Sequence, residues 1–331
     1  FNIQLNITMK HPLMKLSQIQ KDSIKSLNTH PKIKFEKVSC LNCGSDNHMK
    51  LFTNDRYGFN ITKVLCNKCG LMFTNPMHTL NSAAFFYNTN LYRNMLHPRG
   101  VIHSSKADYM KESSSFNFIK SLDLKYQTVC DVGSGIGNGV RLFKSIGKEA
   151  CGYEPSKLFT DLGKKRGLNI INGSADDVKG EYDLVLMDHV LEHLINPIKT
   201  IENLRKHVKK YLFIGVPASE DKFQSFQFSH AYYFSINTLC QIITKCGFKR
   251  INIKHESRSV NDYLSVLFEK IDEKEIYSYD YTHEVKKYKK IYYKYFIKSF
   301  IKKIIRDVLK KINPNIEKKI VKIIDLRTLG H

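Results

Sequence analysis

Long apolar stretches, a leader-like segment and acidic residues are what this sequence has least of. The chain has 331 residues and no run of 18 uninterrupted apolar residues, so we expect no membrane-spanning helix. The segment that begins at Phe1 holds no continuous apolar core of the kind found in secretory signal peptides, so we expect a cytoplasmic location. Asp and Glu number only 31 against 53 Lys and Arg, which gives a formal charge of +22.

The excess positive charge is concentrated late in the sequence, where residues 286–327 hold 15 Lys or Arg and three acids. Residues 284–312 have the period of an amphipathic helix. One face is apolar (Ile297, Phe300, Ile301, Ile304, Ile305, Val308, Leu309 and Ile312), and the other is basic (Lys298, Lys302, Lys303, Arg306 and Lys310). Asn313 and Pro314 end the helix, and a short second helix is expected after them. Either the apolar face packs on the domain or a second subunit, or the helix lies on an anionic membrane. The oligomeric state stays open.

A glycine-rich turn is the most informative pattern in the sequence. An apolar run ends at Asp131 and leads into Gly133, Ser134, Gly135 and Gly137, and a second apolar run ends at Glu154. Alternate glycines let the backbone approach a bound nucleoside, and an acid at a strand end can accept hydrogen bonds from two ribose hydroxyls. The dinucleotide fingerprint has its third glycine at the position where the helix packs on the strand, and this turn has no glycine there. An acid before the glycines repels a pyrophosphate but suits a cationic ligand, and this favours S-adenosylmethionine.

Four segments in order carry a resemblance to a known family. They are the glycine turn and three later stretches, residues 181–197, 211–217 and 230–235. Residues 125–255 resemble a class I S-adenosylmethionine-dependent methyltransferase. An NAD-binding Rossmann domain is the alternative. The resemblance implies an α/β fold with a Rossmann-like, mostly parallel seven-stranded sheet that ends in an antiparallel hairpin.

The order of the expected elements follows from the alternation of apolar runs and helical periods. Strands are expected near 127–132, 149–154, 169–172, 182–188, 211–216, 248–255 and 259–268. Helices are expected near 116–124, 138–147, 156–166, 197–209 and 235–247. Five regions result: a basic arm at 1–36, a zinc ribbon at 37–76, a helical cap at 77–124, the methyltransferase domain at 125–270 and a basic helical tail at 271–331.

The same resemblance implies the residues that bind the cofactor. Glycines of the turn approach the methionine part, Asp131 orients the turn, and Glu154 holds the ribose. Further positions follow the third and fourth strands. The full set is Asp131, Gly133, Ser134, Gly135, Gly137, Glu154, Ala175, Asp176, Met187 and Asp188.

Two Cys-x2-Cys pairs precede this domain. Cys40 with Cys43 and Cys66 with Cys69 are separated by 22 residues, and a glycine follows each pair. Glycine permits the positive φ of a tight turn, and four thiolates suit a closed tetrahedral Zn²⁺ site of a structural kind. Two disulfides are the alternative, which a reducing cytosol disfavours. The ribbon and the residues after it resemble the zinc-binding module of bacterial methyltransferases that act on sugars and other small metabolites.

The catalytic base is sought among three histidines. His189, Glu192 and His193 are spaced to share one face of a helix, and His230 follows in a later segment. We expect His193, His230 or His189 to act as general base. A divalent metal on His189, Glu192 and His193, with His230 as fourth ligand, is a second interpretation. In the third interpretation these residues have no catalytic role. Tyr87, Tyr92, Tyr232 and Tyr233 are candidate walls of the acceptor pocket.

The function expected from these patterns is methyl transfer to a small polar metabolite, a sugar or nucleotide-linked sugar of a surface-polysaccharide pathway. An RNA methyltransferase is the rival, favoured by the cysteines and the basic charge. The Pro-Pro-Tyr and Pro-Cys motifs of base-modifying enzymes are absent, so nucleic acid is the less favoured partner. A cofactor-binding scaffold without catalysis is the third reading. The basic tail is expected to add a peripheral contact with anionic membrane.

Overall fold

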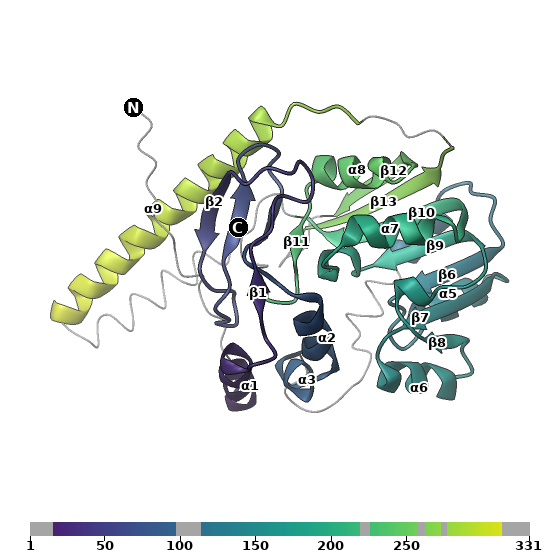
Figure 1. Ribbon diagram of the computed structural model, residues 1–331, viewed down its shortest axis with the longest axis horizontal. Coiled ribbons are helices and arrows are strands. Elements are labelled where there is room, and N and C mark those ends of the chain that lie inside the picture. The colour runs from purple at the N-terminus through teal and green to yellow at the C-terminus, as the bar shows by residue number, and fades with distance from the viewer. Residues whose placement is uncertain (1–15, 97–113, 219–225, 257–261, 273–276, 313–331) are drawn as a thin grey trace. The chain divides into compact units, whose positions relative to one another are not determined.

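The computed structural model describes residues 16–96, 114–218, 226–256, 262–272 and 277–312 (Figure 1). The chain divides into one unit of residues Phe1–Tyr281 and a second of residues Thr282–His331. Tail residues after Ile312, including Asn313 and Pro314, lie outside the described residues. So does the start of the expected basic arm.

The larger unit is built around a seven-stranded sheet with the order β12-β13-β10-β9-β6-β7-β8 (Figure 1). Five neighbouring strands run parallel to one another: β6 (Thr128–Val132), β7 (Glu149–Glu154), β8 (Ile170–Asn172), β9 (Tyr182–Asp188) and β10 (Val208–Pro217). The sheet closes with an antiparallel pair, β12 (Phe248–Glu256) and β13 (Tyr263–Lys270), and β13 runs antiparallel to β10. The α/β fold class and the terminal hairpin expected from the sequence are confirmed.

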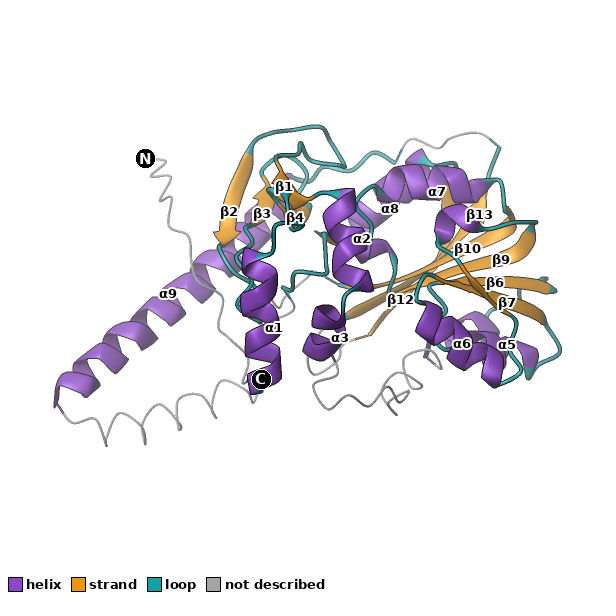
Figure 2. Ribbon diagram, turned by 60° about the horizontal axis from the view of Figure 1, so that its bottom comes forward, coloured by secondary structure: helices purple, strands orange, loops and turns teal. Residues whose placement is uncertain are grey.

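Helices cover both faces of this sheet because strand order reverses between β6 and β9. Right-handed crossovers from β6 lead to β7 on one side, and those from β9 lead to β10 on the other. Accordingly, α5 and α6 lie on one face and α7 and α8 on the other (Figure 2). Their bounds are Asn138–Lys144, Lys157–Lys165, Pro197–Arg205 and Ile236–Lys245.

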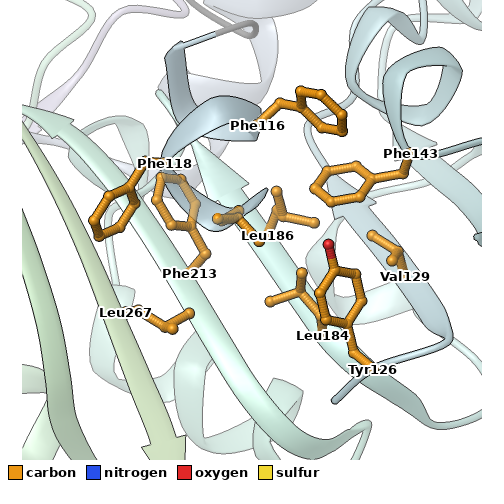
Figure 3. Close-up of a cluster of buried hydrophobic side chains, with 10 residues drawn as sticks. Phe116, Phe118, Tyr126, Val129, Phe143, Leu184, Leu186, Phe213 and Leu267 are labelled. Atoms are coloured by element: carbon orange, nitrogen blue, oxygen red, sulfur yellow. The ribbon is translucent and has the colours of Figure 1, made fainter. Parts of the chain in front are cut away.

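The core under α5 joins the sheet to the helical residues 114–120. Phe143 of α5 meets Phe116 edge to face at 5.2 Å between ring centroids, and both pack near Leu184 and Leu186 of β9 (Figure 3). Such a core fixes the sheet whose strand ends carry the site. The described helix begins two residues before the expected one.

The cysteine-rich N-terminal region forms a second sheet with the order β11-β4-β3-β2. Three of its strands are consecutive, namely β2 (His48–Phe52), β3 (Lys63–Cys66) and β4 (Met72–Thr74). The fourth, β11 (Tyr232–Tyr233), follows β10 in the chain and pairs antiparallel with β4. The sequence did not predict this strand, and it makes residues after β10 part of the N-terminal sheet.

Three helices flank the N-terminal sheet: α1 (Gln18–Thr29), α2 (Leu80–Asn88) and α3 (Asn90–Leu96). Ser17 and Gln20 form a capping box that starts α1. Leu27 of α1 and Phe86 of α2 share an apolar cluster with Phe228. A short pair, β1 (Phe35–Glu36) and β5 (Met77–His78), completes the region.

The second unit contains α9 (Thr282–Ile312), a helix of 31 residues. Six residues of its expected apolar face are 39–55% exposed: Ile297, Phe300, Ile301, Ile304, Ile305 and Val308. Among the residues that the structure describes, every helix falls short of the length and apolar character needed to cross a bilayer.

Candidate functional site

The glycine turn links the end of β6 to α5 and is held against β7. The amides of Gly133 and Ser134 both donate to the Tyr153 carbonyl, at 2.8 and 3.1 Å. Gly135 has φ +55°, and a Cβ at this position would meet no atom within 4 Å. Only glycine adopts such a conformation without strain, and the open space beside it leaves the backbone bare. The turn therefore offers the close approach that the sequence predicted.

Asp131 and Glu154 bracket this turn. Asp131 is buried, and a side chain at Gly139 would collide with its Oδ2 atom, so the carboxylate lies against the first turn of α5. Glu154 accepts hydrogen bonds from the amides of Gly135 (3.0 Å) and Ser156 (2.7 Å), one on each carboxylate oxygen. Each oxygen keeps further lone-pair capacity for a ligand hydroxyl. Burial raises the pKa of Glu154, and the two amides offset part of that shift.

The other expected cofactor residues end the two strands next to β6 and β7. Ala175 and Asp176 lie in a 3-10 turn, η1 (Ala175–Asp177), just after β8. Ala175 is buried, whereas Asp176 is exposed and accepts a hydrogen bond from Asn203 Nδ2 at 3.1 Å. Met187 is buried at the end of β9, and Asp188 accepts a hydrogen bond from the Tyr263 hydroxyl. The carboxyl ends of parallel strands share one edge, so the structure gathers all ten expected residues there.

The histidines do not share a helix face as the spacing suggested. Only Leu191–His193 form a helical turn, the 3-10 helix η2, and His189 precedes it with φ +58°. That single-helix expectation was wrong because His189 still belongs to the end of the sheet, where its amide donates to the Gly215 carbonyl at 2.8 Å. The His189 ring stacks on Tyr263 at 4.8 Å between centroids.

Three imidazoles nevertheless surround the Glu192 carboxylate. His189 Nδ1, His193 Nε2 and His230 Nε2 lie 3.3, 3.9 and 4.0 Å from Glu192 Oε1. Of the described residues, Glu192, His193 and His230 each place a ligand atom within 4.8 Å of the other two, and His189 is not in that group. Glu192 Oε2 and His230 Nδ1 have no hydrogen-bond partner among the described residues.

Hydrogen bonds fix the tautomer of His193. Its Nδ1 atom lies 2.8 Å from the Ser229 carbonyl, which can only accept, so Nδ1 carries the proton. The Tyr87 hydroxyl donates to the same carbonyl at 2.9 Å and lies 3.0 Å from Nδ1. Nε2 therefore presents its lone pair, and the His193 side chain is 24% exposed. This geometry is that of a base.

The charges in this cluster suit the same role. Burial alone would raise the pKa of Glu192, but the hydrogen bond from His189 and the charge of His193 hold it below its usual value. Burial lowers the pKa of His193, and Glu192 offsets part of that effect. Burial also lowers the pKa of His230 well below its usual value. A carboxylate with a lowered pKa thus lies beside two imidazoles, His193 and His230, whose pKa burial lowers as well.

The four cysteines of the N-terminal sheet converge. Cys40 Sγ lies 3.5 Å from Cys69 Sγ, Cys43 Sγ lies 3.5 Å from Cys66 Sγ, and all four sulfurs lie within 4.8 Å of one another. None of the four forms a disulfide. A tetrahedral site with Zn–S bonds of about 2.3 Å places its sulfurs about 3.8 Å apart, so these residues fit a zinc ion. Gly44 and Gly70 have φ +69° and +74°, as predicted.

Some residues near the histidine cluster were expected from the sequence, and others were not. Tyr87 was expected at the site, and it reaches His193. Tyr232 and Tyr233 are buried, and their hydroxyls donate to the carbonyls of Ile195 and Gln227, so both pack as core residues. Asp55 and Lys63 were missed, although both are fully buried and bonded to the segment that carries His230. A lysine at the head of the apolar run Lys63–Cys66 was the available signal.

Comparisons with known proteins find a matching family model and a relative. The model of a family described as methyltransferase domain matches residues 105–253. A stretch of 133 residues is 27% identical to an uncharacterised protein of Methanocaldococcus jannaschii, and it covers 36% of this chain and 65% of that relative. The chain therefore spans just under two thirds of that relative's length.

Two solved structures to which this chain is similar are both methyltransferases. The magnesium protoporphyrin IX methyltransferase of Synechocystis, with bound S-adenosylmethionine, is 14% identical with a TM-score of 0.45, covering 56% of this chain and 94% of that one. The 1,6-didemethyltoxoflavin N1-methyltransferase of Burkholderia thailandensis is 14% identical with a TM-score of 0.48, covering 61% and 96%.

The family match includes β6 to β10, the parallel strands whose ends carry the glycine turn and Glu154. Residues 105–253 are accordingly a methyltransferase domain, which makes up just under half of the chain.

Proposed function

We propose that this methyltransferase acts on a hydroxyl or similar weakly acidic group of a small polar metabolite, a sugar or nucleotide-linked sugar of a surface-polysaccharide pathway. The observation that carries the proposal is His193, whose Nε2 lone pair stands beside the buried Glu192 carboxylate. A sugar hydroxyl holds its proton tightly, so its methylation calls for a base of this kind.

Cofactor binding falls to the ends of four parallel strands. Glu154 would accept hydrogen bonds from the ribose hydroxyls, and the bare turn around Gly135 would lie against the methionine part. Asp131 supplies negative charge near the cationic groups, and Ala175 with Asp176 would contact the adenine end. Met187 and Asp188 would flank the methyl group. S-adenosylmethionine supplies an electrophilic methyl group to such a site.

The proton balance of the reaction assigns a role to His193. The acceptor atom forms a bond to the methyl carbon as the carbon–sulfur bond breaks, and its proton moves to His193 Nε2. Glu192 stabilises the resulting imidazolium, while the Ser229 carbonyl keeps Nδ1–H oriented. His230 and His189 complete the polar wall around Glu192, and each remains an alternative base.

A divalent metal is the second candidate mechanism. Glu192, His193 and His230 offer a buried carboxylate oxygen without a partner and two neutral imidazoles, a donor set that fits such an ion. This set differs from the expected His189, Glu192 and His193. Loss of activity on dialysis against EDTA, restored by Mn²⁺ or Mg²⁺, would favour the metal over the base.

We also propose a structural zinc ion on Cys40, Cys43, Cys66 and Cys69. The convergence of four thiols without a disulfide supports it. No position remains for a substrate in a closed site of this kind, so the zinc would stabilise the N-terminal sheet only.

A separate proposal concerns α9. Its exposed apolar residues and the Lys and Arg that occupy the opposite helical positions match the surface of an anionic membrane. Sedimentation with vesicles of phosphatidylglycerol, but not of phosphatidylcholine, is expected. Equal binding to both vesicle types, or to neither, would contradict it.

Release of S-adenosylhomocysteine across a panel of nucleotide sugars, free sugars and RNA tests the proposed substrate class. We expect turnover with a sugar-like acceptor. Turnover with RNA alone, together with an affinity for RNA that falls steeply with salt, would contradict the sugar-like acceptor and indicate an RNA methyltransferase. Binding of the cofactor without turnover on any acceptor would favour the scaffold.

A further inference from the structure

The segment 226–231, which follows β10 and carries Ser229 and His230, is held by charged side chains of the N-terminal sheet. Its contacts with the sheet are made largely through its backbone. The Arg56 amide donates to the Phe226 carbonyl at 3.0 Å, and the Thr74 amide donates to the Ala231 carbonyl at 2.9 Å. Both ends of the segment are therefore tied to residues before β6.

Lys63 holds the middle of this segment. Its ammonium donates to the carbonyls of Gln227 (3.0 Å) and His230 (2.7 Å), and its third proton goes to Thr74 Oγ1 at 2.6 Å. The side chain is 0% exposed and lies over the Tyr233 ring at 4.9 Å. All three protons of the ammonium have partners, and two of those partners belong to the segment.

Asp55 holds the same segment by accepting a hydrogen bond from it, whereas Lys63 donates. One carboxylate oxygen accepts from the amides of Tyr57 and Phe59, both at 2.9 Å, and the other accepts from the Phe228 amide at 2.6 Å. Asp55 is also 0% exposed. Charge-assisted hydrogen bonds of this length are strong, and here they come from both charges onto one short stretch of chain.

Placement of this segment reaches His193 directly. Ser229 lies between the residues held by Asp55 and Lys63, and its carbonyl accepts from His193 Nδ1 and from the Tyr87 hydroxyl. A displaced Ser229 carbonyl would leave Nδ1 without its partner and allow the other tautomer, in which Nε2 carries the proton. That tautomer cannot accept a proton at Nε2.

We infer that Asp55 and Lys63 are positioning residues, which hold segment 226–231 so that the Ser229 carbonyl keeps the His193 imidazole in its basic tautomer. This inference rests on the proposed role of His193. It makes the cysteine-rich N-terminal region part of the catalytic apparatus through the buried side chains of Asp55 and Lys63. Stability alone is a poor reason to bury two ionisable side chains here, because apolar residues of similar volume often stabilise a core as well or better.

The test compares Lys63→Met with Lys50→Met, a change of an exposed lysine on the neighbouring strand β2. We expect Lys63→Met to lower kcat by about 10- to 100-fold, as a base displaced by about 1 Å would. The stoichiometry and Kd for S-adenosylmethionine, measured by calorimetry, should stay as in the parent enzyme. Lys50→Met should change neither.

A second variant separates positioning from folding. Asp55→Asn with Lys63→Met removes both buried charges and keeps an acceptor for the amides of Tyr57 and Phe59. We expect its unfolding midpoint in urea to recover relative to Lys63→Met, while kcat stays low, because the carbonyls of Gln227 and His230 still lack the ammonium.

Three results would overturn the inference. One is an unchanged kcat in Lys63→Met, another is recovery of kcat with stability in the double variant, and the third is loss of cofactor stoichiometry in parallel with kcat in both variants. A His193→Gln variant with parental kcat would instead overturn the proposed base itself. Failure of the proposed function is thereby distinguished from failure of this inference.

Discussion

Replacement of Glu154 by Ala tests the cofactor site at its most specific point. Each carboxylate oxygen holds one backbone amide, from Gly135 or Ser156, and each has one further direction for a ribose hydroxyl. Two hydrogen bonds to a charged group, each contributing about 1.5 kcal/mol, amount to about 3 kcal/mol. The Kd for S-adenosylmethionine should therefore rise about 150-fold.

Calorimetric titration of the cofactor measures this change. Glu149→Ala provides a matched control, because Glu149 begins the same strand, β7, on an exposed position. The control should bind the cofactor like the parent protein. A Kd for Glu154→Ala within about threefold of the parent value would refute the assignment of the ribose to this carboxylate.

Four further predictions concern the base and the cysteines. His193→Gln should lower kcat by about 10²- to 10⁴-fold with an unchanged Kd for the cofactor, measured by release of S-adenosylhomocysteine. Because burial lowers the pKa of His193, kcat should persist below pH 6.5 and fall only at more acidic pH, where Nε2 is protonated. Glu192→Gln should move that fall to lower pH still, since the carboxylate raises the pKa of His193; a shift to higher pH would contradict the arrangement. Cys66→Ser should lose bound zinc and lower the melting temperature, whereas Cys240→Ser should retain the metal, as measured by elemental analysis.

Much of the larger sheet could be predicted because its strands are local patterns. The expected strand at 149–154 coincides with β7, since an apolar run there is closed by Glu154 and Pro155 at one end. Helix α8 begins at a capping box of Ser235 and Thr238, a signal that lies in the sequence itself. Strand β12 was placed within one residue of its observed end.

Other features depend on residues far apart in the chain. Strand β11 is only two residues long, and it exists because Tyr232 and Tyr233 pair with Phe73 and Met72 of β4. A strand of two residues is too short to show an alternating pattern of apolar and polar residues in the sequence. The backbone of His189 likewise takes a positive φ because of a hydrogen bond to Gly215 on a neighbouring strand. Local propensity disfavours that conformation for histidine.

The candidate site also combines residues that a local pattern reveals with residues that only long-range contacts bring together. The glycine turn and Glu154 could be singled out because a βα turn and the end of the next strand lie within one short stretch of sequence. The partners of His193 could not. Tyr87 precedes the methyltransferase domain in the sequence, whereas Ser229 lies far along it, and only the folded chain brings both to His193. Asp55 and Lys63 do not contact His193 and act on it through segment 226–231.

Hydrogen–deuterium exchange with and without S-adenosylmethionine tests the central claim most directly, namely that the nucleoside binds at the carboxyl ends of β6 and β7. The account predicts slower exchange on cofactor addition in peptides that cover residues 131–138 and 152–156, with a smaller effect at 174–177. Protection confined to other parts of the chain, or none at saturating cofactor, would contradict it.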